Sequence, residues 1–243
     1  GLVGFSFGGP QVVRLAGDPH VGPRLSGVAS FGGYGDLETT IRFQLTGRIP
    51  TASGVVEVRP DPYARWIIGA NYLPHVEGGL EFARVAAALH ALALAAGQRG
   101  TPSWDAMYDP LKVELATPLD PEDRALFDLF APPSERDPRA DHPDVEGWVR
   151  ALTAAARRVE PTIELPHGMS LHTPVHIIHG RGDTLIPFTE ATSMEARIAS
   201  PRPVTSVTGL FAHSGRDSGG RLADLREGVR LLGVLRRVLS VPG

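Results

Sequence analysis

The chain has 243 residues, of which 42% are hydrophobic and 21% charged, and its formal net charge is −3. This length and hydrophobic content suffice for one sizeable core, or for one core with a small accessory domain. It has no basic arm and no acidic tail, and its arginines are scattered, so we expect no nucleic-acid partner but a soluble protein with a small-molecule partner. Cysteine is absent, which excludes disulfides, a thiolate nucleophile and a thiolate metal site and fits a cytoplasmic protein.

The N-terminal segment predicts a strand, a helix and a second strand. Residues 1–5 are apolar and break off at Ser6, a helix-forming stretch follows at residues 11–16, and residues 25–31 have the pattern of a buried strand. Short connections between such elements are typical of a parallel α/β sheet. Because Gly1 already lies inside a strand pattern, we expect a preceding portion of the protein to be missing, and secretion would depend on a signal there.

Residues 36–171 have few strand signals and several helix signals, so they predict a helical insertion. Asp120 followed by Pro121 is typical of a helix start. An apolar stripe at helical spacing runs from residue 80 to residue 94, and the longest apolar stretch, residues 85–96, is too short to span a bilayer. The most regular amphipathic pattern is formed by Val145, Trp148, Val149, Leu152, Ala156 and Val159.

The α/β pattern resumes towards the C-terminus. Residues 174–179 and 204–207 predict strands, residues 188–198 a helix between them, and residues 222–239 a last amphipathic helix. The predicted division of the chain is a first core segment at 1–35, a helical lid or cap at 36–171 and a second core segment at 172–243.

A G-x-S-x-G pentapeptide spans Gly4 to Gly8, with Ser6 at its centre. Such a serine sits on a sharp, strained turn between strand and helix, so that its hydroxyl projects from the edge of the sheet. Side chains at the two flanking positions are expected to collide in this turn, which is the reason for glycine there. The N-terminus of the following helix favours developing negative charge.

A nucleophilic serine needs a base, and the base needs a group that orients it. Asp183 lies in a glycine-flanked loop just after the strand predicted at residues 174–179, where an acid can reach the carboxyl edge of the sheet. His213 follows the strand predicted at residues 204–207. The chain order serine, acid, histidine is the order found in α/β-hydrolases.

Three segments together resemble the α/β-hydrolase superfamily, in the branch that carries a helical lid between its sixth and seventh strands. They are G-F-S-F-G-G at 4–9, H-G-R-G-D-x-x-I-P at 179–187 and A-H-S-G at 212–215. The resemblance covers residues 1–35 and 172–243 well and is only general over the lid.

The resemblance implies that Ser6 is the nucleophile, that His213 acts as general base and then acid, and that Asp183 orients His213. It also implies that the backbone N–H of Phe7 donates one oxyanion hydrogen bond. In the family, the first four strands and most of the fifth normally precede the turn that carries the serine, and they are not in this chain. The loop that gives the second oxyanion donor also precedes this turn and is likewise not in this chain. The fragment alone is therefore expected to be unstable or inactive.

The sequence also offers other candidates for the acid and for a ligand site. Asp36 also follows a predicted strand, and some members of the family place their acid there, but Asp183 is preferred. Asp217, four residues after His213, is expected to cap or solvate its loop. Histidine and carboxylate spacings do not match a metal site, and His176 and His179 are expected to be satisfied on their strand.

Residues 32–35, with the sequence G-G-Y-G, lack the lysine and the spacing of a phosphate-binding loop, so they predict a tight turn. The aromatic residues of the insertion are expected in its own core more often than in a substrate wall. They are Trp66, Tyr72, Trp104, Tyr108, Phe127 and Phe130.

We therefore expect hydrolysis of a carboxylic ester or related acyl bond through an acyl-enzyme, with no cofactor and no metal. The serine disfavours relatives with an aspartate nucleophile, such as dehalogenases and epoxide hydrolases. Thioesterase, C–C bond hydrolase, peptidase and cofactor-free perhydrolase activities on the same triad remain alternatives, as does a non-catalytic, ligand-binding relative. The residues give no signal for an oligomeric state.

Overall fold

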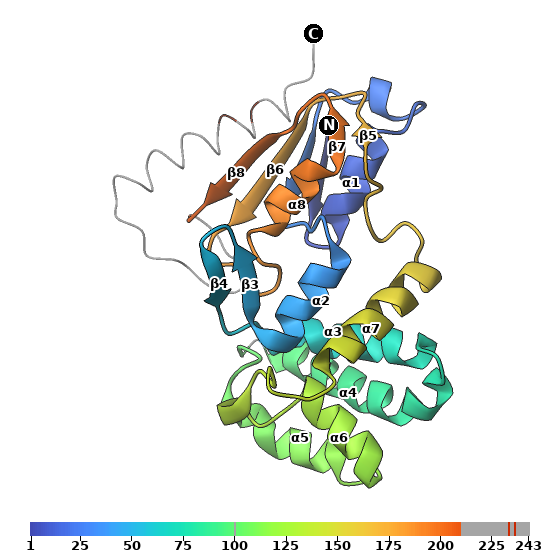
Figure 1. Ribbon diagram of the computed structural model, residues 1–243, viewed down its shortest axis with the longest axis vertical. Helices are drawn as coiled ribbons and strands as arrows, with labels where there is room; N and C mark the ends of the chain where they lie inside the picture. The colour runs from blue at the N-terminus through green and yellow to red at the C-terminus, as the bar shows by residue number, and fades with distance from the viewer. Residues whose placement is uncertain (100, 210–232, 234–235, 237–243) are drawn as a thin grey trace. The chain divides into compact units, whose positions relative to one another are not determined.

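The computed structural model describes residues 1–99, 101–209, 233 and 236 (Figure 1). The chain divides into two compact units, each described by itself below. The first unit comprises residues 1–37 together with the chain from residue 162 onwards, and the second unit comprises residues 38–161. The helix predicted at residues 222–239 lies almost entirely outside the described residues.

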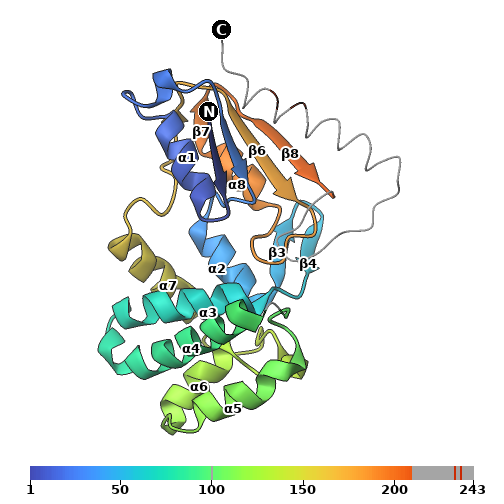
Figure 2. The ribbon, with the colours of Figure 1, turned by 180° about the vertical axis from the view of Figure 1, so that it is seen from behind.

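The first unit is built on a four-stranded sheet in which all neighbouring strands are parallel. Its order is β1 (Leu2–Phe5), β2 (Val28–Phe31), β6 (Val175–Gly180) and β8 (Val204–Thr208) (Figure 2). The strands predicted from the sequence fall within one to three residues of these bounds. The expected α/β architecture with a parallel sheet is therefore confirmed.

Two helices pack on one face of this sheet. They are α1 (Gly8–Ala16) and α8 (Glu190–Ala196), and both contribute to the core that the central strands form. The register explains why β6 is buried at all six positions, since it pairs with β2 on one side and β8 on the other. The core comprises Val13, Ala16, Val28, Leu165, Met169, Leu171, Val175, Ile177, Ala191, Met194 and Ile198.

Short elements complete the first unit. A 3-10 turn η1 (Gly22–Arg24) follows α1, and the two-stranded parallel pair β5 (Met169–Ser170) and β7 (Ile198–Ser200) lies apart from the main sheet. The helix α8 lies inside the stretch predicted as helical at residues 188–198, whose last residue instead begins β7.

The second unit is mainly helical. Its elements in chain order are α2 (Leu37–Thr46), β3 (Arg48–Thr51), β4 (Gly54–Glu57), α3 (Pro62–Tyr72), η2 (Leu73–His75), η3 (Gly79–Phe82), α4 (Ala83–Arg99), η4 (Ala106–Tyr108), α5 (Asp109–Ala116), α6 (Pro121–Phe130), η5 (Ser134–Arg136) and α7 (Val145–Val159). Asp120 caps α6 as its sequence predicts, because its side chain accepts a hydrogen bond from the backbone N–H of Asp123 at 3.0 Å.

The hairpin of β3 and β4 was not anticipated by the helical reading of residues 36–171. Arg48 pairs with Glu57 and Thr51 with Gly54 in an antiparallel register. The turn is closed by the Thr51 hydroxyl, which donates to the Gly54 carbonyl at 2.8 Å. Gly54 has φ 126°, a conformation that glycine adopts without strain.

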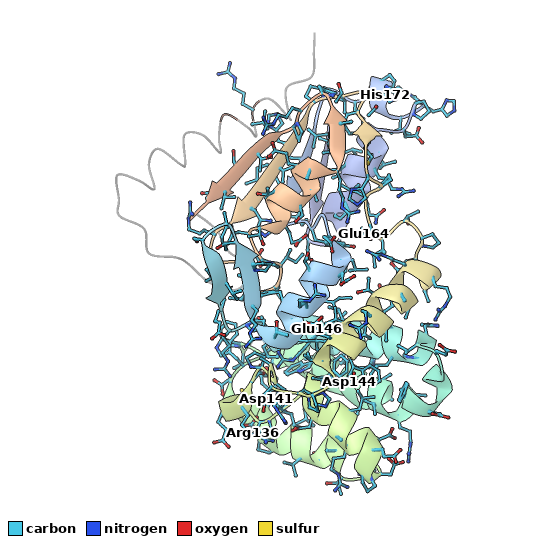
Figure 3. All side chains as sticks on the ribbon, in the orientation of Figure 1. Arg136, Asp141, Asp144, Glu146, Glu164 and His172 are labelled. Carbon is cyan, nitrogen blue, oxygen red and sulfur yellow. The ribbon has the colours of Figure 1, made fainter. Side chains whose placement is uncertain are left out.

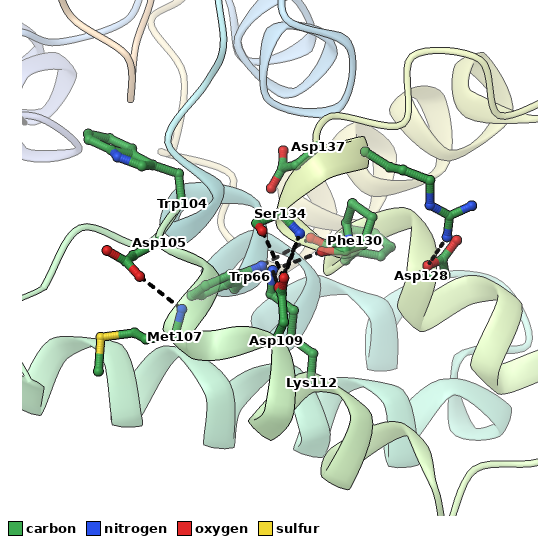
Figure 4. Close-up of polar contacts among 12 residues, drawn as sticks. Trp66, Trp104, Asp105, Met107, Asp109, Lys112, Asp128, Phe130, Ser134 and Asp137 are labelled. Carbon is green, nitrogen blue, oxygen red and sulfur yellow. Dashed lines mark hydrogen bonds and ion pairs between the residues drawn. The ribbon is translucent and has the colours of Figure 1, made fainter.

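Charged groups buried in the second unit are held by backbone carbonyls. Arg65 forms an ion pair with Asp137, and both side chains are almost fully buried. The Arg65 Nε donates to the Phe130 carbonyl at 2.6 Å. The indole N–H of Trp66 donates to the same oxygen at 3.0 Å (Figure 4). A buried charge needs such partners, because each unmet hydrogen bond costs free energy.

A second polar cluster of this unit joins α5 to the residues after α6. The Asp109 carboxylate accepts hydrogen bonds from Lys112 Nζ at 2.9 Å and from the Ser134 hydroxyl at 2.7 Å (Figure 4). Lys112 also donates to the Pro132 carbonyl at 2.8 Å. Asp109 therefore holds the segment that follows α6 against α5.

Among the helices of the described residues, none combines the length and the apolar character that crossing a membrane requires.

Candidate active site

Ser6 occupies the turn between β1 and α1 and has φ 51°. Among the described residues it is the only one other than glycine with a positive φ. For an L-amino acid this left-handed conformation costs about 1–2 kcal/mol. Two backbone hydrogen bonds hold it there: the Ser6 N–H donates to the Phe31 carbonyl at 2.9 Å, and the Gly9 N–H donates to the Ser6 carbonyl at 2.9 Å.

The glycines around Ser6 differ in whether a side chain at their position would collide with a neighbouring residue. A side chain on Gly4 would collide with the carbonyl of Gly8, and one on Gly9 would collide with the Ser30 hydroxyl and lie 2.8 Å from Gly33 Cα. The expected collision at Gly8 is wrong, since nothing in the described part of the chain lies within 4 Å of a Cβ built there. Gly9 carries the steric requirement instead, because it lets α1 approach β2 closely.

Phe7 follows Ser6 at the N-cap of α1. Within the described part of the chain its backbone N–H has no hydrogen-bond partner, as expected at the first turn of a helix. An N–H in this position is available to an oxygen atom bound beside Ser6. The Phe7 ring is 40% exposed and makes an edge contact with the Tyr34 ring, with centroids 5.4 Å apart.

Asp183 lies in the loop after β6 and is 3% exposed. Its Oδ1 accepts hydrogen bonds from the backbone N–H groups of Leu185 and Ile186, each at 2.9 Å. This is the local bonding by which aspartate side chains organise turns. The loop therefore fixes one oxygen of the carboxylate by its own backbone.

The parallel register brings the candidate residues to one edge of the sheet. Ser6 follows the last residue of β1, and Asp183 follows β6, which is separated from β1 by β2 alone. Two strand spacings correspond to about 10 Å. The neighbouring strand β8 ends at Thr208, whose carbonyl accepts from the Arg181 N–H at 2.7 Å. His213 lies beyond β8, outside the described residues, as does Asp217.

The alternative acid, Asp36, is engaged in a different network. Its carboxylate lies 3.1 Å from Arg197 Nη2, and the same nitrogen lies 2.7 Å from Glu164 Oε1 (Figure 3 labels Glu164). The backbone N–H groups of Gly35 and Asp36 donate to the buried carboxylate of Glu190 at 3.0 and 2.7 Å. This arrangement gives Asp36 a structural role in the turn at residues 32–36.

His176 and His179 both lie in β6 and are buried. His179 differs from the sequence-based expectation, because its Nε2 reaches the acid loop and lies 3.3 Å from Asp183 Oδ2. Sequence reasoning gave this histidine no role beyond its strand. The signal that was present is its spacing of four residues from Asp183 across a glycine-rich turn.

No family model matches the chain, and no curated protein matches it. Solved structures do. The rice cell wall degrading esterase LipA from Xanthomonas oryzae is 15% identical with a TM-score of 0.44, and the match covers 97% of this chain and 57% of LipA. The 2-hydroxy-6-oxo-6-phenylhexa-2,4-dienoate hydrolase BphD from Rhodococcus sp. strain RHA1 is 16% identical with a TM-score of 0.34, covering 97% of this chain and 62% of BphD.

A serine hydrolase from the polyaromatic hydrocarbon-degrading bacterium Cycloclasticus zankles is 13% identical with a TM-score of 0.35, and the match covers 97% of this chain and 62% of that protein. The chain thus spans about three fifths of the length of each of these structures.

Proposed function

We propose that this chain is part of an α/β-hydrolase-fold serine hydrolase, with Ser6 as nucleophile, His213 as general base and acid, and Asp183 as the carboxylate that orients His213. The observation that carries the proposal is the left-handed backbone of Ser6 at the junction of β1 and α1. A strained serine between a strand and a helix N-terminus is the geometry that exposes a nucleophilic hydroxyl. The buried, hydrogen-bonded Asp183 at the same sheet edge supports it.

The proposed reaction proceeds in two halves. The Ser6 hydroxyl attacks the carbonyl carbon of an ester while His213 takes its proton, and the negative oxygen that forms accepts a hydrogen bond from the Phe7 N–H. The C–O bond to the alcohol then breaks, and the alcohol leaves with the proton from His213. Water, deprotonated by His213, attacks the acyl-enzyme, and Ser6 recovers its proton as the acid departs.

A carboxylic ester is favoured as substrate by the apolar surface next to Ser6. The rings of Phe5 and Phe7, the two residues beside Ser6, are 67% and 40% exposed. Apolar surface of this kind fits an acyl chain better than a charged group. A thioester, a C–C bond beside a carbonyl or a peptide would be cleaved by the same residues.

A fluorophosphonate probe tests the proposal, because it reacts only with an activated serine. In the full-length protein, we expect the wild type to be labelled and Ser6→Ala to be unlabelled, with Ser30→Ala as the matched control that keeps its label. Asp183→Asn is expected to slow labelling strongly. Well-folded wild-type protein that takes no label would support the non-catalytic, ligand-binding alternative.

We also propose that residues 36–171 serve as a lid that selects substrates. The insertion point favours this role, since the chain leaves the first unit just after β2 and returns to it before β6. The acyl-length preference of a variant that lacks the second unit decides between a lid and an unrelated inserted domain.

A further inference from the structure

His179 is the fifth residue of β6 and has no exposed side-chain surface. Its ring lies against the acid loop that follows the strand. The Nε2 atom is 2.9 Å from the Ile186 carbonyl oxygen and 3.3 Å from Asp183 Oδ2. The ring therefore contacts both the middle and the end of the loop that holds the proposed catalytic carboxylate.

The contact with Ile186 fixes the position of one hydrogen. A carbonyl oxygen only accepts hydrogen bonds, so Nε2 carries the hydrogen and donates it. Asp183 Oδ2 lies within reach of the same N–H. His179 thus donates to the loop backbone at Ile186 while the same nitrogen lies beside the carboxylate of Asp183.

The second ring nitrogen of His179, Nδ1, shows that packing alone does not account for a histidine at this position. His179 Nδ1 is buried and has no hydrogen-bond partner within the described part of the chain. A buried polar atom without a partner is unfavourable, and a leucine of similar size would avoid it on a strand that is otherwise rich in valine and isoleucine. Packing therefore does not account for a histidine at this position, whereas the hydrogen bond from Nε2 does.

We propose that His179 is a positioning residue for Asp183. The backbone of the loop holds Oδ1 through hydrogen bonds from Leu185 and Ile186, and His179 Nε2 lies 3.3 Å from Oδ2. These contacts on both oxygens disfavour rotation of the carboxylate about its last side-chain bond. This inference rests on the proposed function, because it assigns His179 an effect on turnover through the orientation of Asp183.

Two replacements at His179 test the role in the full-length protein. Each is made in the wild-type background and in the Asp183→Asn background. Leucine removes the donor at similar volume, and glutamine retains an N–H near the place of Nε2. We expect His179→Leu to lower kcat for p-nitrophenyl butyrate by about 10- to 100-fold with KM unchanged, counted per molecule of folded protein. His179→Gln should stay within about threefold of wild type. In the Asp183→Asn background, His179→Leu should cost less than about twofold, because the group through which it acts is already altered.

The outcomes separate the two proposals. Full-length wild-type protein that is well folded but neither takes the label nor turns over ester overturns the proposed function and the positioning role with it. Wild-type activity with full kcat in His179→Leu overturns the positioning role alone. Equal losses from His179→Leu in both backgrounds, or a loss in His179→Gln as large as in His179→Leu, would do the same by showing an effect that does not pass through Asp183. Because thermal melts report the folding of each variant independently of activity, and His179→Gln keeps the polarity of the site, poor folding of the leucine variant does not hide the result.

Discussion

Ser6 has a left-handed backbone conformation, which glycine adopts with less strain than serine. Ser6→Gly should therefore abolish activity while raising the free energy of unfolding by up to about 1–2 kcal/mol, since the left-handed penalty disappears. Ser6→Ala is the matched control, because it also lacks the hydroxyl but keeps the penalty.

Urea unfolding of the three proteins measures this difference. A glycine variant that is no more stable than the alanine variant would contradict the strain described at Ser6.

Gly9 and Gly8 form a second pair with opposite expectations. Gly9→Ala places a methyl group against Ser30 and Gly33, so we expect a loss of about 1–3 kcal/mol from overpacking. Gly8→Ala meets open space at the first helical position of α1 and should be neutral, or stabilising by up to about 1 kcal/mol. Thermal melts of the two variants decide the matter, and equal destabilisation would show that α1 does not approach β2 as described.

The candidate site was predictable from sequence only in part. The sequence singles out Asp183 as a candidate because glycines flank it just after a predicted strand, and Ser6 because its pentapeptide lies between strand and helix; both roles remain predictions. The role of Gly8 was misjudged, since which glycine meets a neighbour depends on how closely α1 packs on β2. The contact of His179 was out of reach because it arises only when the loop turns back so that Ile186 faces the strand. The place of His213 stays a prediction.

At the scale of single elements, α5 depends on its first residue, Asp109. Burial alone would raise the pKa of this carboxyl, but hydrogen bonds from Lys112 and Ser134 outweigh burial and hold the pKa below its usual value. The unfolded chain then binds this proton at a higher pH than the folded one. Stability from Asp109 is present above the unfolded pKa of about 3.9 and is lost as pH falls through the lower, folded pKa.

We expect Asp109→Asn to lower the urea midpoint at pH 7 and to weaken the fall in that midpoint between neutral and acidic pH. Asp144→Asn is the matched control, because the Asp144 side chain makes no capping hydrogen bond at the start of α7. If both variants follow the wild-type dependence on pH, the hydrogen bonds of Asp109 do not contribute to stability.

Element by element, the sequence predicted long periodic helices best. The spacing of apolar residues gave α7 at Val145–Val159 with the observed bounds, and the Asp120–Pro121 pair marked the start of α6. The β3–β4 hairpin was not predictable from the sequence for two reasons. Each strand has four residues, too few for an alternating pattern, and Pro50 in β3 argues against a strand. Pairing partners stabilise such strands, and these are not visible in a local window.

For the whole molecule, the two points where the chain leaves and re-enters the first unit lie close together. The Leu37 N–H donates to Glu164 Oε1 at 3.1 Å, and the Tyr34 hydroxyl donates to the Ile163 carbonyl at 2.5 Å. A short glycine-serine linker can therefore replace residues 38–161 without stretching the first unit.

If the second unit is a lid, this excision should leave turnover of p-nitrophenyl acetate within about tenfold of the full chain and abolish the preference among longer acyl chains. Rates for a series of acyl lengths measure the effect. An unchanged preference, in a variant that melts cooperatively, would mean that residues 38–161 do not select the substrate.

The positive φ of Ser6 also bears on the history of the chain. In a relative that only binds its ligand, the Ser6 hydroxyl would have no chemical role. Replacement by glycine would then be favoured at this position, because it removes the strain of the positive φ. On the proposed function, selection for the Ser6 hydroxyl would account for a serine at a position where the backbone alone favours glycine. Descendants that have given up catalysis should accordingly be recognisable by one exchange, with glycine at position 6 inside an otherwise unchanged turn.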